Sequence, residues 1–210
     1  MIESDFMAIE MNKSSCSWFS TYGIVPHLIQ LSGSKSILEV GVAYGYHAEF
    51  MLNSLPHISY TGVDPYLAGY DPHDIFCQDV QRLMGEVDQQ VAMDRLYAVV
   101  EYKLNKYDSR AKLMRKKSEE GAISLPNHSV DLIYIDGDHT YEGVMKDLNS
   151  WWDKVNHQSG VICGDDFSWL GVKKACDDFF NSKNLQYSLI KKNGYEHIPV
   201  WYYDFSQRIK

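Results

Sequence analysis

Residues 132–141 read Leu-Ile-Tyr-Ile-Asp-Gly-Asp-His-Thr-Tyr, and the rest of the chain can be interpreted outward from this stretch. Four large apolar residues in succession are typical of a strand that is buried on both faces of a sheet. The run ends at Asp136, Gly137, Asp138 and His139, and a helix is expected to follow. Open parallel α/β sheets bind ligands outside the carboxyl ends of their strands. Asp136 and His139 are therefore the first candidate catalytic residues.

Strand and helix patterns alternate along the chain. Short apolar runs predict strands at 36–40, 58–63, 112–116, 130–135, 161–164, 187–190 and 199–203. Apolar residues at helical spacing predict helices at 22–31, 46–55, 75–107 with a break near Gly85, 118–125, 141–156 and 170–181. This alternation predicts an α/β fold with a mostly parallel sheet covered on both faces. The last two strands are too close for a helical crossover, so we expect a hairpin with an antiparallel last strand.

The length and composition fit one domain over residues 1–210. We expect residues 1–35 to form an N-terminal arm and a helix, and residues 66–108 to form a helical insertion or cap. Lys and Arg number 20 against 28 Asp and Glu, which gives a net charge of −8, and the basic cluster at 110–117 is too short to bind nucleic acid alone. The expected partner is a small molecule, not nucleic acid, and a homo-oligomer is left open.

Cysteine usage and hydropathy indicate where the protein resides. The four cysteines (Cys16, Cys77, Cys163 and Cys176) form no C-x-x-C pair, so neither a zinc motif nor a disulfide framework is expected. The N-terminus carries no basic region followed by an apolar run. No apolar stretch approaches the ~20 residues of a membrane-spanning helix. We therefore expect a reduced, cytoplasmic setting and no membrane partner.

A glycine-containing turn between a strand and a helix gives the first ligand signal. Residues 39–45 read Glu-Val-Gly-Val-Ala-Tyr-Gly, which is not the G-x-G-x-x-G pattern of dinucleotide-binding proteins, so an NAD-dependent oxidoreductase is disfavoured. By itself this segment could be a packing turn. Asp64 ends the next strand, where an acid can accept both hydroxyls of a ribose, although Asp64 before Pro65 could also be a simple turn. Together the two signals favour a nucleoside ligand.

These residues resemble the class I S-adenosylmethionine-dependent methyltransferases. Glu39 to Gly45 matches their E/D-x-G-x-x-x-G turn, and Asp64 matches their ribose-binding acid. The D-G-D-H-x-Y motif at 136–141 and the G-D-D-F motif at 164–167 are similar to those of enzymes related to macrocin-type sugar O-methyltransferases. The resemblance implies a Rossmann-like, seven-stranded sheet. It also implies cofactor contacts from Glu39, Gly41, Ala43, Tyr44, Gly45, Asp64, Ser118 and Asp136.

A divalent metal is the next expectation. The resemblance implies one, and the residues give a separate reason, because Asp136, Asp165 and Asp166 end neighbouring predicted strands and their carboxylates would repel one another without a cation. Hard oxygen ligands select ions such as Mg²⁺. Such an ion could hold two substrate hydroxyl oxygens and lower the pKa of one of them. The alternative is that Asp165 caps the next helix and Asp166 is solvated.

His139 has the pKa range of a general base for an acceptor hydroxyl. It could instead orient Asp136, or cap the helix that begins at Tyr141. Trp169 and Tyr66, beyond strand ends, are candidate acceptor-pocket residues. The predicted activity is metal-assisted O-methylation of a small hydroxylated acceptor such as a sugar or polyol. The alternatives are a non-methylating, hydroxylase-like relative, and a non-catalytic scaffold that retains the cofactor pocket.

Overall fold

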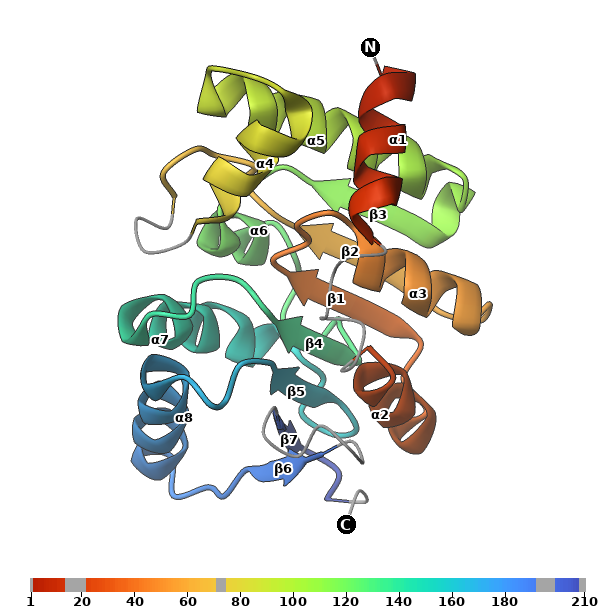
Figure 1. Cartoon of the computed structure of the whole chain (residues 1–210). Helices are drawn as coiled ribbons and strands as arrows, with labels where there is room; N and C mark the ends of the chain where they lie inside the picture. The colour runs from red at the N-terminus through yellow and green to blue at the C-terminus, as the bar shows by residue number, and fades with distance from the viewer. Residues whose placement is uncertain (1, 14–21, 71–74, 192–198, 208–210) are drawn as a thin grey trace.

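The computed structural model describes residues 2–13, 22–70, 75–191 and 199–207. Its strands form one seven-stranded sheet in the order β3-β2-β1-β4-β5-β7-β6 (Figure 1). The strands are β1 Ser36–Val40, β2 Ser59–Val63, β3 Ala111–Met114, β4 Leu132–Ile135, β5 Val161–Gly164, β6 Ser188–Ile190 and β7 Val200–Asp204. Strands β1 to β5 pair in parallel, and β7 is antiparallel to both β5 and β6. The predicted sheet and its C-terminal hairpin are confirmed.

Helices cover both faces of the sheet. They are α1 Ile2–Lys13, α2 Ile24–Ser32, α3 Tyr46–Ser54, α4 Phe76–Met84, α5 Gln89–Asn105, α6 Ser118–Ile123, α7 Tyr141–Trp151 and α8 Leu170–Ser182. Because successive strand residues point to opposite faces, two separate cores form. In β4, Leu132 and Tyr134 join the core with α1 to α5, whereas Ile133 and Ile135 join the core with α6 to α8. Strand β4 is buried on both faces, as its apolar run predicts.

The stretch 66–108 holds two helices. Helix α4 ends at Gly85, whose φ of +59° is a left-handed conformation that glycine adopts without strain. The predicted helix break near Gly85 is therefore confirmed. Helix α5 buries Leu96, Val99 and Val100 completely in the core that also includes β1 and β2. This helix is thus part of the layer that covers the sheet.

The N-terminal helix α1 lies against α5 (Figure 1). Ile9 is fully buried in the shared core. Asp5 accepts two hydrogen bonds from Arg95, the shorter at 2.6 Å, and Glu10 accepts one of 2.8 Å from the Lys103 ammonium group. Helix α1 is therefore fixed to the body of the protein by ion pairs and by apolar contacts of Ile9 and Phe6.

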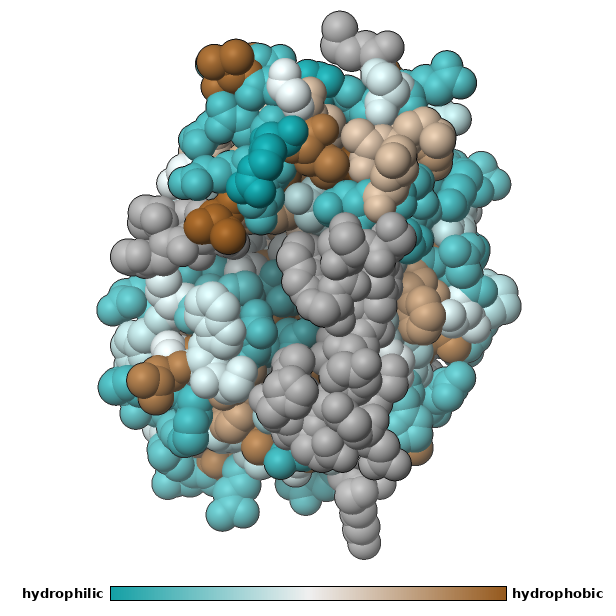
Figure 2. Space-filling model, in the orientation of Figure 1, coloured by the Kyte–Doolittle hydropathy of each residue, from teal (hydrophilic) through white to brown (hydrophobic). Residues whose placement is uncertain are grey.

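The face drawn in Figure 2 is mainly hydrophilic where residues are described. Apolar side chains are exposed singly, such as Met11 on α1 and Val87 before α5, and such scattered residues are normal on protein surfaces. Within the described residues, every helix is too short or too polar to cross a lipid bilayer.

Candidate active site

The predicted glycine turn joins β1 to α3, and close packing requires both of its glycines. Gly41 has a φ of +86°, and a Cβ added there would lie 2.0 Å from the carbonyl oxygen of Asp136. Gly45 has a φ of +70°, and its Cβ would lie 2.9 Å from Val100 Cγ1 on α5. Side chains at these positions would therefore clash with β4 and with α5. The contact between Gly41 and Asp136 also brings the turn beside the end of the central strand.

Asp64 holds this turn from the end of β2. Its Oδ2 accepts hydrogen bonds from the backbone N–H groups of Val42 (2.9 Å) and Ala43 (3.0 Å), and its Oδ1 accepts one from Tyr66 (2.8 Å). Burial raises the pKa of Asp64, although the three N–H donors oppose that rise. Ala43 has a φ of +49°, which is unfavourable for a residue with a Cβ. The carboxylate of Asp64 therefore stabilises a strained turn, and its contact with a ribose stays a prediction.

Glu39 lies behind the turn and is buried. One of its carboxylate oxygens accepts the hydroxyl of Tyr60, and the other lies 2.7 Å from Nδ1 of His47. The Nε2 atom of His47 is buried and has no hydrogen-bond partner among the described residues. A charged side chain in a buried strand needs hydrogen-bond partners, so the position of Glu39 in the sequence indicates that partners exist. The sequence does not indicate that these partners are Tyr60 and His47.

Two tyrosines near the turn belong to the core. Tyr44 stacks on Tyr46 with ring centroids 5.3 Å apart and contacts Phe76 edge-on. Tyr66 is fully buried, and its hydroxyl donates to the carbonyl oxygen of Ala43. Tyr66 therefore does not line an exposed acceptor pocket, and that prediction is wrong. The predicted contact between Tyr44 and the cofactor stays a prediction.

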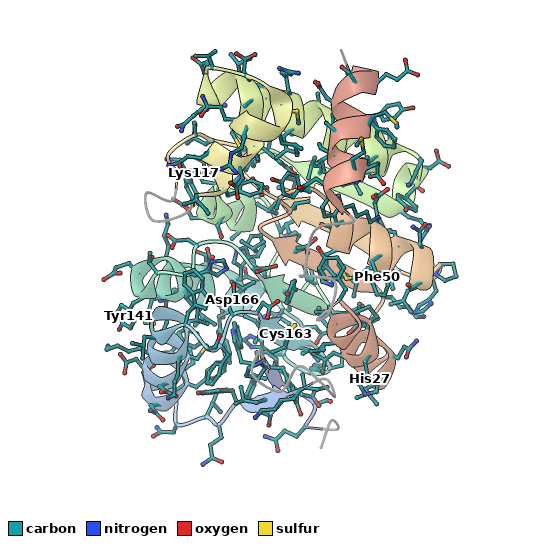
Figure 3. All side chains as sticks on the ribbon, in the orientation of Figure 1. His27, Phe50, Lys117, Tyr141, Cys163 and Asp166 are labelled. Carbon is teal, nitrogen blue, oxygen red and sulfur yellow. The ribbon has the colours of Figure 1, made fainter. Side chains whose placement is uncertain are left out.

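The ends of β4 and β5 bring an acidic cluster together. His139 Nε2 lies 3.1 Å from Asp166 Oδ2 and 3.5 Å from Asp136 Oδ1. One ligand atom from each of these residues lies within 4.8 Å of the other two, which is compact enough to hold a metal ion. In Figure 3, Asp166 lies just beyond the end of β5, in which Cys163 is labelled.

Asp165 differs from the expected arrangement. Its Oδ2 accepts the hydroxyl of Tyr134 (3.0 Å), and its Oδ1 accepts the N–H of Asp166 (2.8 Å). The compact cluster therefore contains His139 where Asp165 was expected. Burial and the charges of Asp136 and Asp166 raise the pKa of Asp165 to about 7. Asp165 stays next to the cluster and feels its negative charge.

Two alternative roles are excluded by the helix caps. The N-cap of α7 is Thr140, whose Oγ1 accepts the N–H of Gly143 (3.0 Å), so His139 does not cap this helix. The N-cap of α8 is Trp169, so Asp165 does not cap the next helix. Neither His139 nor Asp165 is therefore explained by helix capping.

Ser118 is the first residue of α6 and is buried on the face of the sheet that α6, α7 and α8 cover. Its Oγ accepts the indole N–H of Trp151 (2.7 Å) and is hydrogen-bonded to Asp147. Burial raises the pKa of Asp147 to about 7; the charge of Asp138 adds to the rise, and the Ser118 hydroxyl opposes it. Asp147 is a polar core residue whose role the sequence did not reveal. The predicted contact between Ser118 and the adenine stays a prediction.

Comparisons with known proteins agree with this geometry. A family model described as a methyltransferase domain matches residues 38–167. Protein R132 of Acanthamoeba polyphaga mimivirus, which is uncharacterized, is 36% identical over 70 residues, or 31% of this chain and 31% of that protein. The chain thus aligns with less than a third of that relative.

Solved structures share the fold at low sequence identity. The SAH-bound methyltransferase PaMTH1 of Podospora anserina has a TM-score of 0.59 at 15% identity, with 95% of this chain and 86% of that chain covered. A SAM-dependent methyltransferase of Aquifex aeolicus gives 0.57 at 11% identity, with 94% and 98% covered. An O-methyltransferase family protein of Burkholderia thailandensis gives 0.55 at 9%, with 87% and 54% covered. The family model spans well over half of the 210 residues, so the chain belongs to the methyltransferase domain family and has the class I fold.

Proposed function

We propose that this protein is an S-adenosylmethionine-dependent O-methyltransferase that modifies a small hydroxylated acceptor such as a sugar or polyol. One observation carries the proposal: Asp136, His139 and Asp166 converge within 4.8 Å, and Asp136 adjoins the glycine turn through the Gly41 contact. A proton acceptor and a cofactor turn thus lie side by side. The family match and the fold support the same reaction class.

The chain's own groups fit a nucleoside cofactor with an amino acid tail. Asp64 has two oxygens with about four acceptor positions, and three N–H groups use three of them. One position is left for a ribose hydroxyl. Helix α3 begins at the turn without a side-chain cap, so its first N–H groups favour an anion such as the methionine carboxylate. Nε2 of His47, which has no hydrogen-bond partner in the described part of the chain, lies in the same helical turn.

A divalent metal fits the acidic end. We propose Mg²⁺ held by Asp136, Asp165 and Asp166, because carboxylate oxygens are its preferred ligands and because the pKa of Asp165, raised by burial and also by the charges of Asp136 and Asp166, includes a repulsion that a cation would relieve. Bound there, the ion would polarise the acceptor's hydroxyl oxygen. Since the compact cluster contains His139, a donor set with an imidazole should be tested in parallel with Mn²⁺.

His139 is the proposed general base. Its imidazole takes the proton of the acceptor hydroxyl as the oxygen attacks the methyl carbon of S-adenosylmethionine, whose S–CH₃ bond breaks to leave S-adenosylhomocysteine. The carboxylates of Asp166 and Asp136, 3.1 and 3.5 Å away, stabilise the imidazolium that forms. The remaining role of the chain is to hold the two reactants in line, which accounts for much of the rate in such transfers.

The test incubates the full-length protein with S-adenosylmethionine, Mg²⁺ or Mn²⁺, and panels of sugars, polyols and catechols, followed by mass spectrometry. We expect a product heavier by one methylene group and stoichiometric S-adenosylhomocysteine. A product heavier by one oxygen would replace the proposal with the hydroxylase-like alternative. Tight cofactor binding in calorimetry with no turnover of any acceptor would favour the scaffold, and no cofactor binding at all would refute the proposal.

A further inference from the structure

An exposed indole stands beside the acidic cluster. Trp169 is 55% exposed and the next residue, Leu170, is 85% exposed, whereas Trp151 and Trp201 are buried in the core. Figure 2 shows hydrophobic atoms at the amino end of α8 within a hydrophilic surface. Large aromatic side chains usually bury most of their area, so an indole left open at the edge of a site is available for a ligand.

Backbone contacts fix this indole relative to His139. The N–H of Trp169 donates to the carbonyl oxygen of Asp166 (2.8 Å), and its own carbonyl accepts the N–H of Lys173 (2.9 Å). A Cβ at Gly171 would lie 2.7 Å from the carbonyl oxygen of His139, so α8 packs directly on the loop that carries the histidine. The ring centroids of Trp169 and His139 are 5.2 Å apart. The backbone that carries the indole is therefore held in place, and the ring forms a wall next to the proposed base.

The charges around this wall select against anions. Three carboxylates lie at the adjoining strand ends: Asp136, Asp165 and Asp166. The lysines in the first turns of α8 are already paired, Lys173 with Asp177 and Lys174 with Asp178, at 2.5 and 2.7 Å. An acceptor with a carboxylate or phosphate next to its hydroxyl would still meet net negative charge, because one divalent cation offsets only two of these carboxylates and α8 contributes no free lysine.

We infer that Trp169 is the acceptor platform and that the acceptor is an uncharged or cationic compound whose ring face stacks on the indole. The inference rests on the proposed function, because it places the acceptor hydroxyl at His139. It sharpens that function by separating neutral or amino sugars and catechols from uronic acids, sugar phosphates and aromatic acids. Trp169 acts as a specificity-determining residue.

The test measures binding to the protein loaded with S-adenosylhomocysteine and Mg²⁺, by calorimetry and saturation-transfer NMR. Two matched series serve as probes: methyl glucoside, glucosamine and glucuronate, and 4-methylcatechol, dopamine and 3,4-dihydroxybenzoate. In at least one series we expect the neutral and cationic members to bind about tenfold more tightly than the anion. W169A should weaken that binding about tenfold, whereas W169F should keep it within about threefold because a stacking face remains. L170A is the matched control and should change little.

Equal affinity for the anionic member, or unchanged binding by W169A, would overturn the inference. So would a failure of both series to bind while S-adenosylhomocysteine binds normally. S-adenosylhomocysteine affinity is measured in the same samples and should be the same in W169A as in wild type. If the wild-type protein does not bind S-adenosylhomocysteine, the proposed function itself is refuted. Failure of the inference and failure of the proposed function therefore give different results.

Discussion

The glycine turn and the acidic strand ends lie side by side, yet the protein treats their polar groups in opposite ways. At the turn, Asp64 accepts three backbone N–H groups, and both oxygens of Glu39 have protein partners. At the ends of β4 and β5, Asp136 and Asp166 face His139 at 3.1 to 3.5 Å while Asp165 adds a further negative charge nearby. The carboxylates of the first region are held mainly by hydrogen bonds within the protein, whereas those of the second retain unbalanced charge.

This difference separates carboxylates that stabilise the fold from carboxylates that are available for binding and catalysis. A carboxylate whose lone pairs accept backbone N–H groups stabilises the folded state, and removing it leaves buried donors unsatisfied. Carboxylates that crowd one another cost stability unless a cation or a proton balances them. The turn is thus built before a cofactor arrives, whereas the acidic end depends on what binds there.

The largest expected effect comes from breaking the acidic end at His139. H139A should lower kcat by about 10² to 10⁴-fold, the range of general acid–base catalysis, because His139 is the one imidazole among the described residues of the cluster. Affinity for S-adenosylhomocysteine should stay within about twofold, since the turn is intact. The measurement is methyl transfer beside calorimetry. H27A, an exposed histidine on α2 labelled in Figure 3, is the control, and full activity in H139A would remove the base assignment.

The next effect comes from breaking the turn at Asp64. D64N removes one acceptor oxygen and leaves a buried N–H unpaired, so the free energy of unfolding should fall by about 1–2 kcal/mol. The dissociation constant for S-adenosylhomocysteine should rise about tenfold, or 1.4 kcal/mol. D131N is a matched control, because Asp131 Oδ2 accepts the N–H groups of Lys35 and Ser36 at the opposite end of β1, both at 2.9 Å.

D131N should therefore lose stability while binding the cofactor normally. Chemical denaturation and calorimetry on the two variants separate a folding role from a ligand role. If D64N binds as tightly as the wild type, Asp64 only shapes the turn and does not contact the ribose. If both variants lose affinity equally, the loss follows from stability alone.

The smallest expected effect is on the stability of the folded protein and concerns Asp147, a buried residue of α7 that lies next to Gly137 in the loop after β4. Its pKa is raised to about 7 in the folded protein, so the folded state holds the proton more tightly than the unfolded chain does. Its contribution to stability is present at low pH and is lost as pH rises from about 4 through about 7. D147N keeps a polar partner for Ser118 without this titration. It should match the wild type near pH 4 and be more stable at pH 8 by on the order of 1 kcal/mol.

Thermal denaturation of the wild type and D147N across this pH range is the measurement. D153N, at an exposed aspartate in the 3₁₀ turn after α7, serves as the control and should track the wild type throughout. A constant stability difference between D147N and the wild type at all pH values would mean that Asp147 does not carry the proton assigned to it.

Local patterns determined much of this protein from the sequence alone. The apolar run at 132–135 predicted a strand buried on both faces, and Gly85 predicted the break between two helices. The short link before the last strand predicted the antiparallel hairpin. These features depend on neighbouring residues, on the two-residue period of strands and on the backbone freedom of glycine, so a sequence window is enough to find them.

Only the tertiary structure decided which polar atoms meet. Asp165 accepts a hydrogen bond from Tyr134, and the compact cluster contains His139 in its place. Thr140, not His139, is the N-cap of α7. His47 and Tyr60, eight and 21 residues away, became the partners of Glu39. The physical reason is that hydrogen bonds and like-charge repulsion depend on distances of a few ångströms between residues from different strands and helices. Strand order and loop packing set those distances, and no local pattern encodes them.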